Sequence, residues 1–304
     1  MILNTSYFYH ILLFISATLR SLYPILIRFY PNSIFIQTFL RFLTFTIVLG
    51  FYLFFKTSFS FKQILTFSYW KENMYPALLQ FVHIITSYLS FTYLSPGIAI
   101  SIFYTYPIFV NIFETYFYKF FEISHTESSK KTISKYLFFA LFGVILTQWN
   151  VLFSKDIKYS SVYLILLGIF MAFLSSLTEA LLTIHSKHHI EKEDSVEYLF
   201  NIHSIGTFLI LFFLLFYKHK FKLFKPISST FYIILFNSII GVLSFYLLIL
   251  ALKNLQIEHF SSIVYIGVIM AYIFGYIFFK IKIEWYHILG TIFILFAIYK
   301  NLKI

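Results

Sequence analysis

Residues 93–110 read YLSPGIAISIFYTYPIFV, an apolar stretch that follows a Ser-Pro-Gly break and carries Pro107. The stretch shows no alternation of polar and apolar residues, and apolar residues continue to about residue 119, which predicts a membrane-spanning helix. Part of its pattern recurs 161 residues later in the chain. The aligned residues are Leu94, Ser101, Ile102 and Tyr104 over Leu255, Ser262, Ile263 and Tyr265. We therefore interpret the stretch as one copy of a repeated membrane element.

The composition of the whole chain is that of a membrane protein. Of its 304 residues, 60% are apolar and only 12% are charged, which is about half the charged fraction of a soluble domain. A membrane-spanning helix needs about 20 mostly apolar residues, so ten such helices would use about two thirds of the chain. This leaves no room for a second folded domain of ordinary size and excludes a cytosolic enzyme.

The net charge of +11 does not point to nucleic acid in this chain. Most Lys and Arg residues lie between apolar runs, where they act as interfacial anchors and topology signals. The chain has no cysteine, which excludes disulfides, zinc-thiolate sites and a cysteine nucleophile. We expect no cofactor, no metal and no nucleic-acid partner, and the sequence does not indicate an oligomeric state.

Apolar runs separated by charges, prolines or serine clusters define ten segments of the all-α fold. They lie near residues 7–29, 34–55, 74–94, 97–119, 135–153, 160–186, 196–217, 229–251, 259–280 and 284–302. The first has no small-residue cleavage site after it, so we expect a retained span. A small lysine and arginine bias of the connections favours a cytoplasmic N-terminus, whereas the basic cluster at residues 218–225 favours the opposite orientation. We expect a multi-pass protein with both termini in the cytoplasm. We favour a plasma or bacterial inner membrane over an organelle membrane.

Further matches between the two halves support an internal duplication. A shift of 155 residues aligns Ala17, Leu19, Ser21 and Leu22 with Ala172, Leu174, Ser176 and Leu177, and a shift of 162 aligns Ser33 with Ser195 and Arg41 with His203. We expect five-helix repeats at residues 1–153 and 154–304. Because five is an odd number, the second repeat would be inverted relative to the first.

The chain resembles the drug/metabolite transporter superfamily of the EamA type. The resemblance is carried by Pro31, by Arg41-Phe42, by residues 93–110, by Ala251-Leu252-Lys253-Asn254-Leu255 and by Gly290. It implies ten helices in two inverted five-helix repeats and a central cavity lined by spans 1, 3, 4, 6, 8 and 9. The sequence departs from the family pattern at Val268, the counterpart of Pro107. It also has Glu122 and Glu284 without the family's preceding glycine.

Polar residues align on one face of the same six spans, as a water-filled cavity requires. We take as substrate-cavity candidates Arg20, His83, Tyr104, Asn111, Glu114, Ser175, Glu179, Asn237 and Tyr265. Small residues also gather on one face where helices pack together, so packing is the alternative interpretation. Arg41, Pro107 and His203 are candidates for structural or gating roles.

Four charged residues lie inside the predicted spans and away from their ends. Arg20, Arg41, Glu114 and Glu179 each cost about 2.5–3.5 kcal/mol at the centre of a helix in a membrane, so they should face protein or water and be paired. In one interpretation the arginines attract an anionic group of the solute while Glu114 or Glu179 takes up a proton. In the other, all four form static salt bridges between helices.

These features predict a secondary-active transporter of small organic solutes that works by alternating access, not an enzyme. One alternative is a desaturase-like membrane enzyme, since residues 185–189 read HSKHH, a spacing that suits iron ligands. The other histidines are scattered singly along the chain, so we expect residues 185–189 to form a polar loop. A non-transporting membrane scaffold is the second alternative.

Overall fold

The computed structural model describes residues 5–29, 33–56, 60–94, 96–116, 135–147, 149, 162–190, 194–216, 227–280 and 282–302. Within these ranges all regular structure is helical. A helix, or a run of consecutive helices, lies at each of the ten predicted segments. The predicted all-α class is therefore confirmed.

The described part of the first half contains seven α-helices and a short 3₁₀ turn. They are α1 (Thr5–Arg20), α2 (Tyr23–Phe29), α3 (Ile34–Phe54), η1 (Phe61–Leu65), α4 (Phe67–Tyr93), α5 (Pro96–Phe103), α6 (Tyr106–Tyr116) and α7 (Lys135–Thr147). The second half contains α9 (Val162–His189), α10 (Ser195–Phe216), α11 (Ile227–Phe236), η2 (Asn237–Gly241), α12 (Val242–Asn254), α13 (Ile257–Ile263), α14 (Ile266–Phe279) and α15 (Trp285–Leu302). The short element η2 is a π-helical turn that joins α11 to α12.

Seven helical segments of the described chain are long and apolar enough to cross a membrane. Two more, Ile98–Glu114 and Lys135–Thr147, are apolar but shorter. Many large apolar side chains on these helices are exposed, for example Phe51 and Phe212, as lipid contact requires. The protein is an integral, multi-pass membrane protein.

Two sequence-based boundaries were wrong. Helix α4 begins at Phe67 rather than near residue 74, because the Thr66 hydroxyl accepts a hydrogen bond from the Tyr69 N–H and caps the helix there. The expected loop at residues 185–189 is helical, because α9 continues to His189. Basic side chains in the last turn interact favourably with the carbonyl end of a helix.

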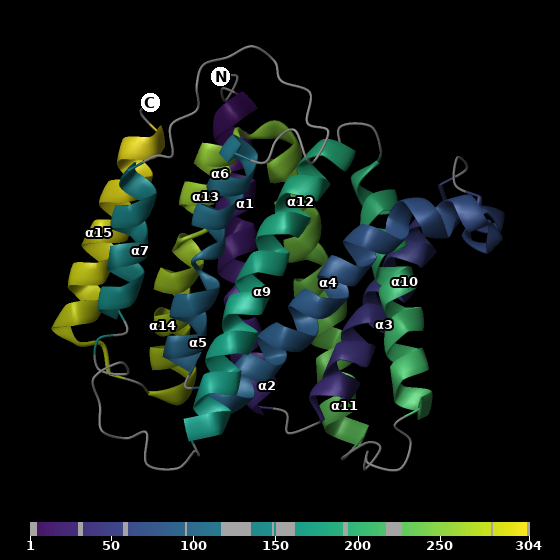
Figure 1. Cartoon of the computed structure of the whole chain (residues 1–304), viewed down its shortest axis with the longest axis horizontal. Helices are drawn as coiled ribbons and strands as arrows, with labels where there is room; N and C mark the ends of the chain where they lie inside the picture. The colour runs from purple at the N-terminus through teal and green to yellow at the C-terminus, as the bar shows by residue number, and fades with distance from the viewer. Residues whose placement is uncertain are drawn as a thin grey trace.

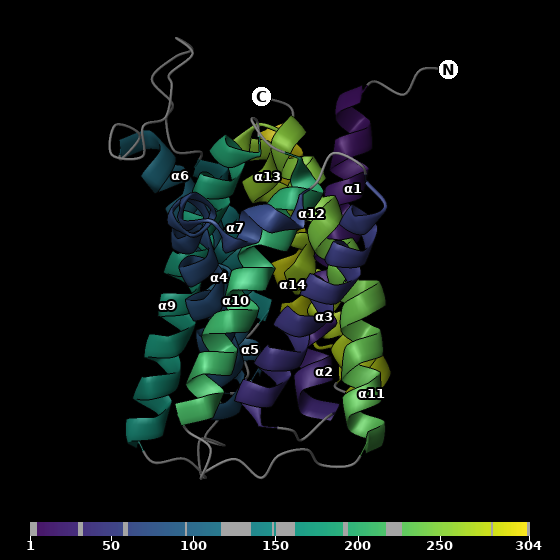
Figure 2. The same ribbon diagram turned by 90° about the vertical axis from the view of Figure 1, so that its right-hand side faces the viewer.

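The helices form one bundle in which the two halves of the chain are interleaved (Figures 1 and 2). Helix α1 begins and α15 ends at the same end of the bundle, which we call the terminal face (Figure 1). The most extensive packing joins a helix of one half to a helix of the other. The pairs are α1 with α12, α3 with α10, α4 with α9, and α7 with α15.

Two spans are broken near the middle at corresponding positions. Helix α5 ends at Phe103 and α6 begins at Tyr106, just before Pro107, which has no N–H to continue a helix. Helix α13 ends at Ile263 and α14 begins at Ile266, although the second span has no proline there. The substitution of valine for the second proline therefore does not remove the break.

Candidate functional site

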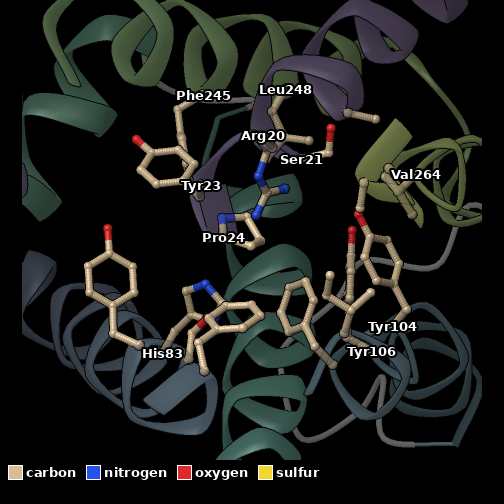
Figure 3. A pocket seen from close by; sticks show the side chains of 18 of the residues that line it. Arg20, Ser21, Tyr23, Pro24, His83, Tyr104, Tyr106, Phe245, Leu248 and Val264 are labelled. Atoms are coloured by element: carbon tan, nitrogen blue, oxygen red, sulfur yellow. The ribbon is translucent and has the colours of Figure 1, made fainter. Parts of the chain in front are cut away.

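A central cavity opens between the two halves of the bundle, with about 720 Å³ of space including its mouth. It is lined from α1–α2, α3, α4, α5–α6, α12 and the α13–α14 region. The lining residues with polar side chains are Arg20, Ser21, Tyr23, Arg41, His83, Ser87, Tyr88, Tyr104 and Tyr106. Figure 3 shows Arg20 reaching from α1 into the middle of this cavity, with His83 approaching from α4.

A buried ion pair crosses the bundle beside the cavity. Arg20 Nη2 lies 2.6 Å from Glu179 Oε1, and the two side chains are 15% and 4% exposed. The pair joins α1 to α9 and so connects the first half of the chain to the second. Removing one partner of such a buried pair leaves an uncompensated charge and costs about 3–5 kcal/mol. We call this contact the Arg20–Glu179 bridge.

His83 completes the group around Glu179. Its Nε2 lies 3.4 Å from Glu179 Oε2, and its Nδ1 lies 3.2 Å from both the carbonyl oxygen and the hydroxyl of Ser175. When Nδ1–H donates to the Ser175 carbonyl, Nε2 faces a carboxylate and can hold a proton there. Glu179 thus lies between a fixed cation, Arg20, and a titratable one, His83.

Arg41 also lines the central cavity and is held by aromatic rings. Its guanidinium carbon is 4.4 Å from the Tyr23 ring centroid and 4.9 Å from that of Phe245. Its Nη1 donates to the Tyr88 hydroxyl at 3.3 Å. Cation–π contacts of this kind are worth up to about 2 kcal/mol when they are desolvated. They hold the guanidinium in place without neutralising its charge.

Tyr23 is itself fixed by the π-helical turn η2. Its hydroxyl donates to Asn237 Oδ1 at 3.1 Å, and a Cβ added at Gly241 would lie 2.5 Å from that hydroxyl. Asn237 in turn donates to the Ile233 carbonyl at 2.9 Å. Such π-helical turns within helices often occur at functional sites. Here the turn supports the ring that packs on Arg41.

A second, smaller cavity of about 330 Å³ lies on the other side of the bridge. Its lining includes Gln80, Glu179, Thr183, Ser186 and Tyr198. Ser186 is near the end of α9 that reaches the terminal face, so this cavity is closer to that face than the central one. Both side-chain polar atoms of fully buried Gln80 have no hydrogen-bond partner.

The two cavities are separated by a thin partition. Phe245 and Leu248 line both of them, Arg20 lines the central cavity, and Glu179 lines the second one. The bridge and these two side chains therefore form the partition. The bridge therefore lies between the two cavities.

The structure brings several predicted cavity residues together and places others apart. Arg20, His83 and Tyr104 line the central cavity, Glu179 lines the second, and Ser175 lies behind His83. Arg41, expected among the structural or gating residues, lines the central cavity. Span 6, expected to line the central cavity, instead contributes to the second one through α9.

The remaining candidates lie outside the lining of both cavities. Asn111 donates to the Pro107 carbonyl at 2.8 Å and to the Ser261 hydroxyl at 2.9 Å, so it joins α6 to α13. Tyr265 is fully buried, with its ring centroid 6.1 Å from that of Tyr104. Glu114 lies two residues before the end of α6.

His203, the last candidate, is also buried within the packed helices. Its Nδ1 lies 2.7 Å from the Leu199 carbonyl, one turn earlier in α10, and its ring stacks on that of Phe45. These contacts fit a histidine that joins two packed helices, which is the structural reading. Neither cavity includes it in its lining.

Sequence reasoning did not select the aromatic residues that surround Arg41 and the bridge. Tyr88, Tyr106 and Phe245 line the central cavity, but in a chain with 43 Phe and 25 Tyr an aromatic residue carries little information. The useful signal was Arg41 itself. A charge inside a span requires partners, and the partners in this case are rings.

The histidines of residues 185–189 do not form a metal centre in the described structure. The rings of His185 and His189 stack with centroids 5.3 Å apart, and His189 packs on Tyr198. Within the described ranges, no group of three or more His, Asp or Glu side chains is arranged to hold a metal ion.

Comparisons with known proteins agree with this architecture. Residues 166–302 match the model of the EamA-like transporter family, which confirms the resemblance predicted from the sequence. Among solved structures 27 chains match. One, titled only as the crystal structure of a protein, has a TM-score of 0.70 and 10% identity, with 95% of this chain and 94% of that chain covered. At this identity the likeness shows the fold alone. No curated protein matches the sequence.

Proposed function

Because the second half of the chain carries an EamA-like transporter unit, we propose that the protein is a secondary-active transporter of small organic solutes. The family match itself indicates a membrane transporter of small solutes; alternating access is our proposal for the mechanism. The observation that carries it is the pair of cavities on either side of the Arg20–Glu179 bridge.

The architecture we propose is ten membrane-spanning helices in two inverted five-helix repeats, residues 1–153 and 154–304. Three observations support it. Helix α1 begins at the terminal face, whereas α9, its expected counterpart, ends there (Figure 1). The packing of α1 on α12 has a counterpart in that of α4 on α9. The fourth and ninth spans are both broken near the middle. We place both termini in the cytoplasm, from the lysine and arginine bias of the connections.

In the proposed cycle a solute enters the central cavity and contacts Arg20, His83 and Tyr104. Protonation of Glu179 removes the negative charge that holds Arg20, so the bridge weakens and the partition between the cavities opens. The second cavity then becomes continuous with the first, and the solute leaves at the terminal face. This scheme makes Glu179 the group that couples transport to protons.

Transport into liposomes tests the proposal. Purified protein should accumulate at least one member of a broad panel of small metabolites under a pH gradient, and Glu179→Gln should abolish the accumulation. The variant Lys62→Gln, on the exposed turn η1, should transport normally. Absence of transport for every solute under every ion gradient would point instead to a scaffold. Iron or zinc bound to the purified protein would point to an enzyme.

A further inference from the structure

The two cavities contain an excess of positive charge. Among the described residues that line them, the permanently charged groups are the guanidiniums of Arg20 and Arg41. The carboxylate of Glu179 opposes them. Protonation of His83 or Glu179 would only increase the excess. An unneutralised charge within a membrane protein is costly and therefore marks a functional group.

The positive charge that remains without a counter-ion is that of Arg41. Glu179 already neutralises Arg20 at 2.6 Å, whereas no acidic residue pairs with Arg41 in the described part of the chain. A guanidinium has five N–H donors, and the Tyr88 hydroxyl accepts from one of Arg41's nitrogens. Its Nε is buried and has no hydrogen-bond partner. Arg41 is therefore a fixed, 4% exposed cation at the edge of the cavity, and no acidic side chain of the described residues neutralises it.

The two arginines are close enough to act on one small ligand. Both guanidinium carbons lie near the ring of Phe245, at 4.8 Å for Arg20 and 4.9 Å for Arg41. They are thus no more than about 10 Å apart. A ligand that carries one negative charge can bind Arg41 while the Arg20–Glu179 bridge stays intact.

Apart from the two arginines, His83 and the serine and tyrosine hydroxyls, the wall of the central cavity is apolar. Its walls include Phe91, Ile100, Phe103, Leu248 and Val264. These side chains offer no partner to a second charge, and they fit a ligand with an apolar body. A cationic ligand would increase the net positive charge of the two cavities, and a dianion would make their net charge negative.

From the single unpaired guanidinium and the aromatic walls, we infer that the solute is a small organic monoanion, a carboxylate on an apolar or aromatic body. A carboxylate matches the planar fork of a guanidinium and forms strong charge-assisted hydrogen bonds with it. The inference rests on the proposed function, because it names the class of substrate for the same cavity.

A matched ligand series tests the inference on the unmodified protein. Phenylacetate, its neutral amide and phenethylamine share one aromatic body and differ in charge. We expect phenylacetate to raise the unfolding temperature of purified protein and to bind at least about tenfold more tightly than the amide. Equal or tighter binding of the amide or of the amine would overturn the inference.

Variants of Arg41 test whether this residue binds the carboxylate. Arg41→Gln should weaken carboxylate binding at least about tenfold and leave binding of the amide unchanged, Arg41→Lys should restore part of the loss, and Lys62→Gln should have no effect. Unchanged carboxylate binding in folded Arg41→Gln would contradict the assignment. In liposomes, transport of neutral or cationic solutes alone would refute this inference and leave the proposed function standing. Transport of nothing would refute the proposed function.

Discussion

The Arg20–Glu179 bridge predicts opposite effects for single and double substitutions. Glu179→Gln leaves Arg20 buried without its counter-ion and should lower the free energy of unfolding by about 3–5 kcal/mol. The double variant Arg20→Met with Glu179→Gln removes both charges and should recover most of that loss. Chemical unfolding in detergent measures the free energy of unfolding of the single and the double variant. If the double variant regains stability but not transport, the bridge is functional; if it regains transport as well, the bridge is only structural.

A second prediction concerns the pH dependence of a pair at the terminal face. Lys56 Nζ lies 2.9 Å from Asp194 Oδ2, and Asp194 Oδ1 accepts hydrogen bonds from the N–H groups of Val196 and Glu197 at the start of α10. Partial burial alone would raise the pKa of Asp194, but these bonds outweigh it and lower the pKa. The native pKa is then below the unfolded value, so the stabilisation is present near neutral pH and is lost as the pH falls through the native pKa.

The variant Asp194→Asn isolates the charge, because asparagine also caps a helix. Both partners are partly exposed, so we expect a loss of no more than about 1 kcal/mol at pH 7. The difference in unfolding temperature from the unmodified protein should begin to shrink as the pH falls below about 4, near the ordinary pKa of aspartate, and should disappear below the native pKa. A difference that stays constant down to pH 3 would contradict the charge-based account.

At the scale of whole helices, the backbones of α7 and α15 approach each other closely where two glycines face one another. A Cβ at Gly143 would lie 2.6 Å from the Gly290 carbonyl oxygen, and one at Gly290 would lie 2.5 Å from the Gly143 carbonyl oxygen. Helix propensity alone favours Gly143→Ala by about 1 kcal/mol. The clash is with backbone that cannot rotate away, so we expect the variant to be destabilised by about 1–3 kcal/mol instead.

Gly50→Ala is the matched control for this prediction, because its Cβ would meet the edge of the Phe200 ring, at 3.0 Å. Thermal unfolding in detergent should show a clearly larger decrease for Gly143→Ala than for Gly50→Ala. If Gly143→Ala raised the unfolding temperature, the close crossing of α7 and α15 would be wrong.

The helices were the part of the fold that the sequence predicted well, and the contacts between them were the part it did not. Apolar runs are local, so each of the ten segments could be located from composition alone. Arg41 shows the difference: its position inside a span is local information, but its packing on Tyr23 and Phe245 depends on how α2, α3 and α12 come together. Likewise, no proline in the sequence predicts the break before α14.

At the scale of the molecule, alternating access requires the two cavities to exchange exposure between the two faces. Lys187 holds two helix ends together at the terminal face. Its Nζ donates to the carbonyls of Leu252 at 2.7 Å, Leu255 at 2.9 Å and Lys253 at 3.1 Å. This ammonium joins the end of α9 to the end of α12. We expect it to hold the second cavity closed toward the terminal face.

The absence of cysteine from the chain allows a direct test with single cysteines. Ser87→Cys reports on the central cavity, and Thr183→Cys reports on the second one. A membrane-impermeant maleimide should label Ser87→Cys from the face opposite the terminal face, and should label Thr183→Cys only slowly from the terminal face.

Adding Lys187→Met should increase labelling of Thr183→Cys and decrease that of Ser87→Cys, because opening one side closes the other. Lys62→Met should change neither rate. If Lys187→Met increased both rates together, the variant would be loosening the bundle rather than shifting it between two states, which would contradict alternating access.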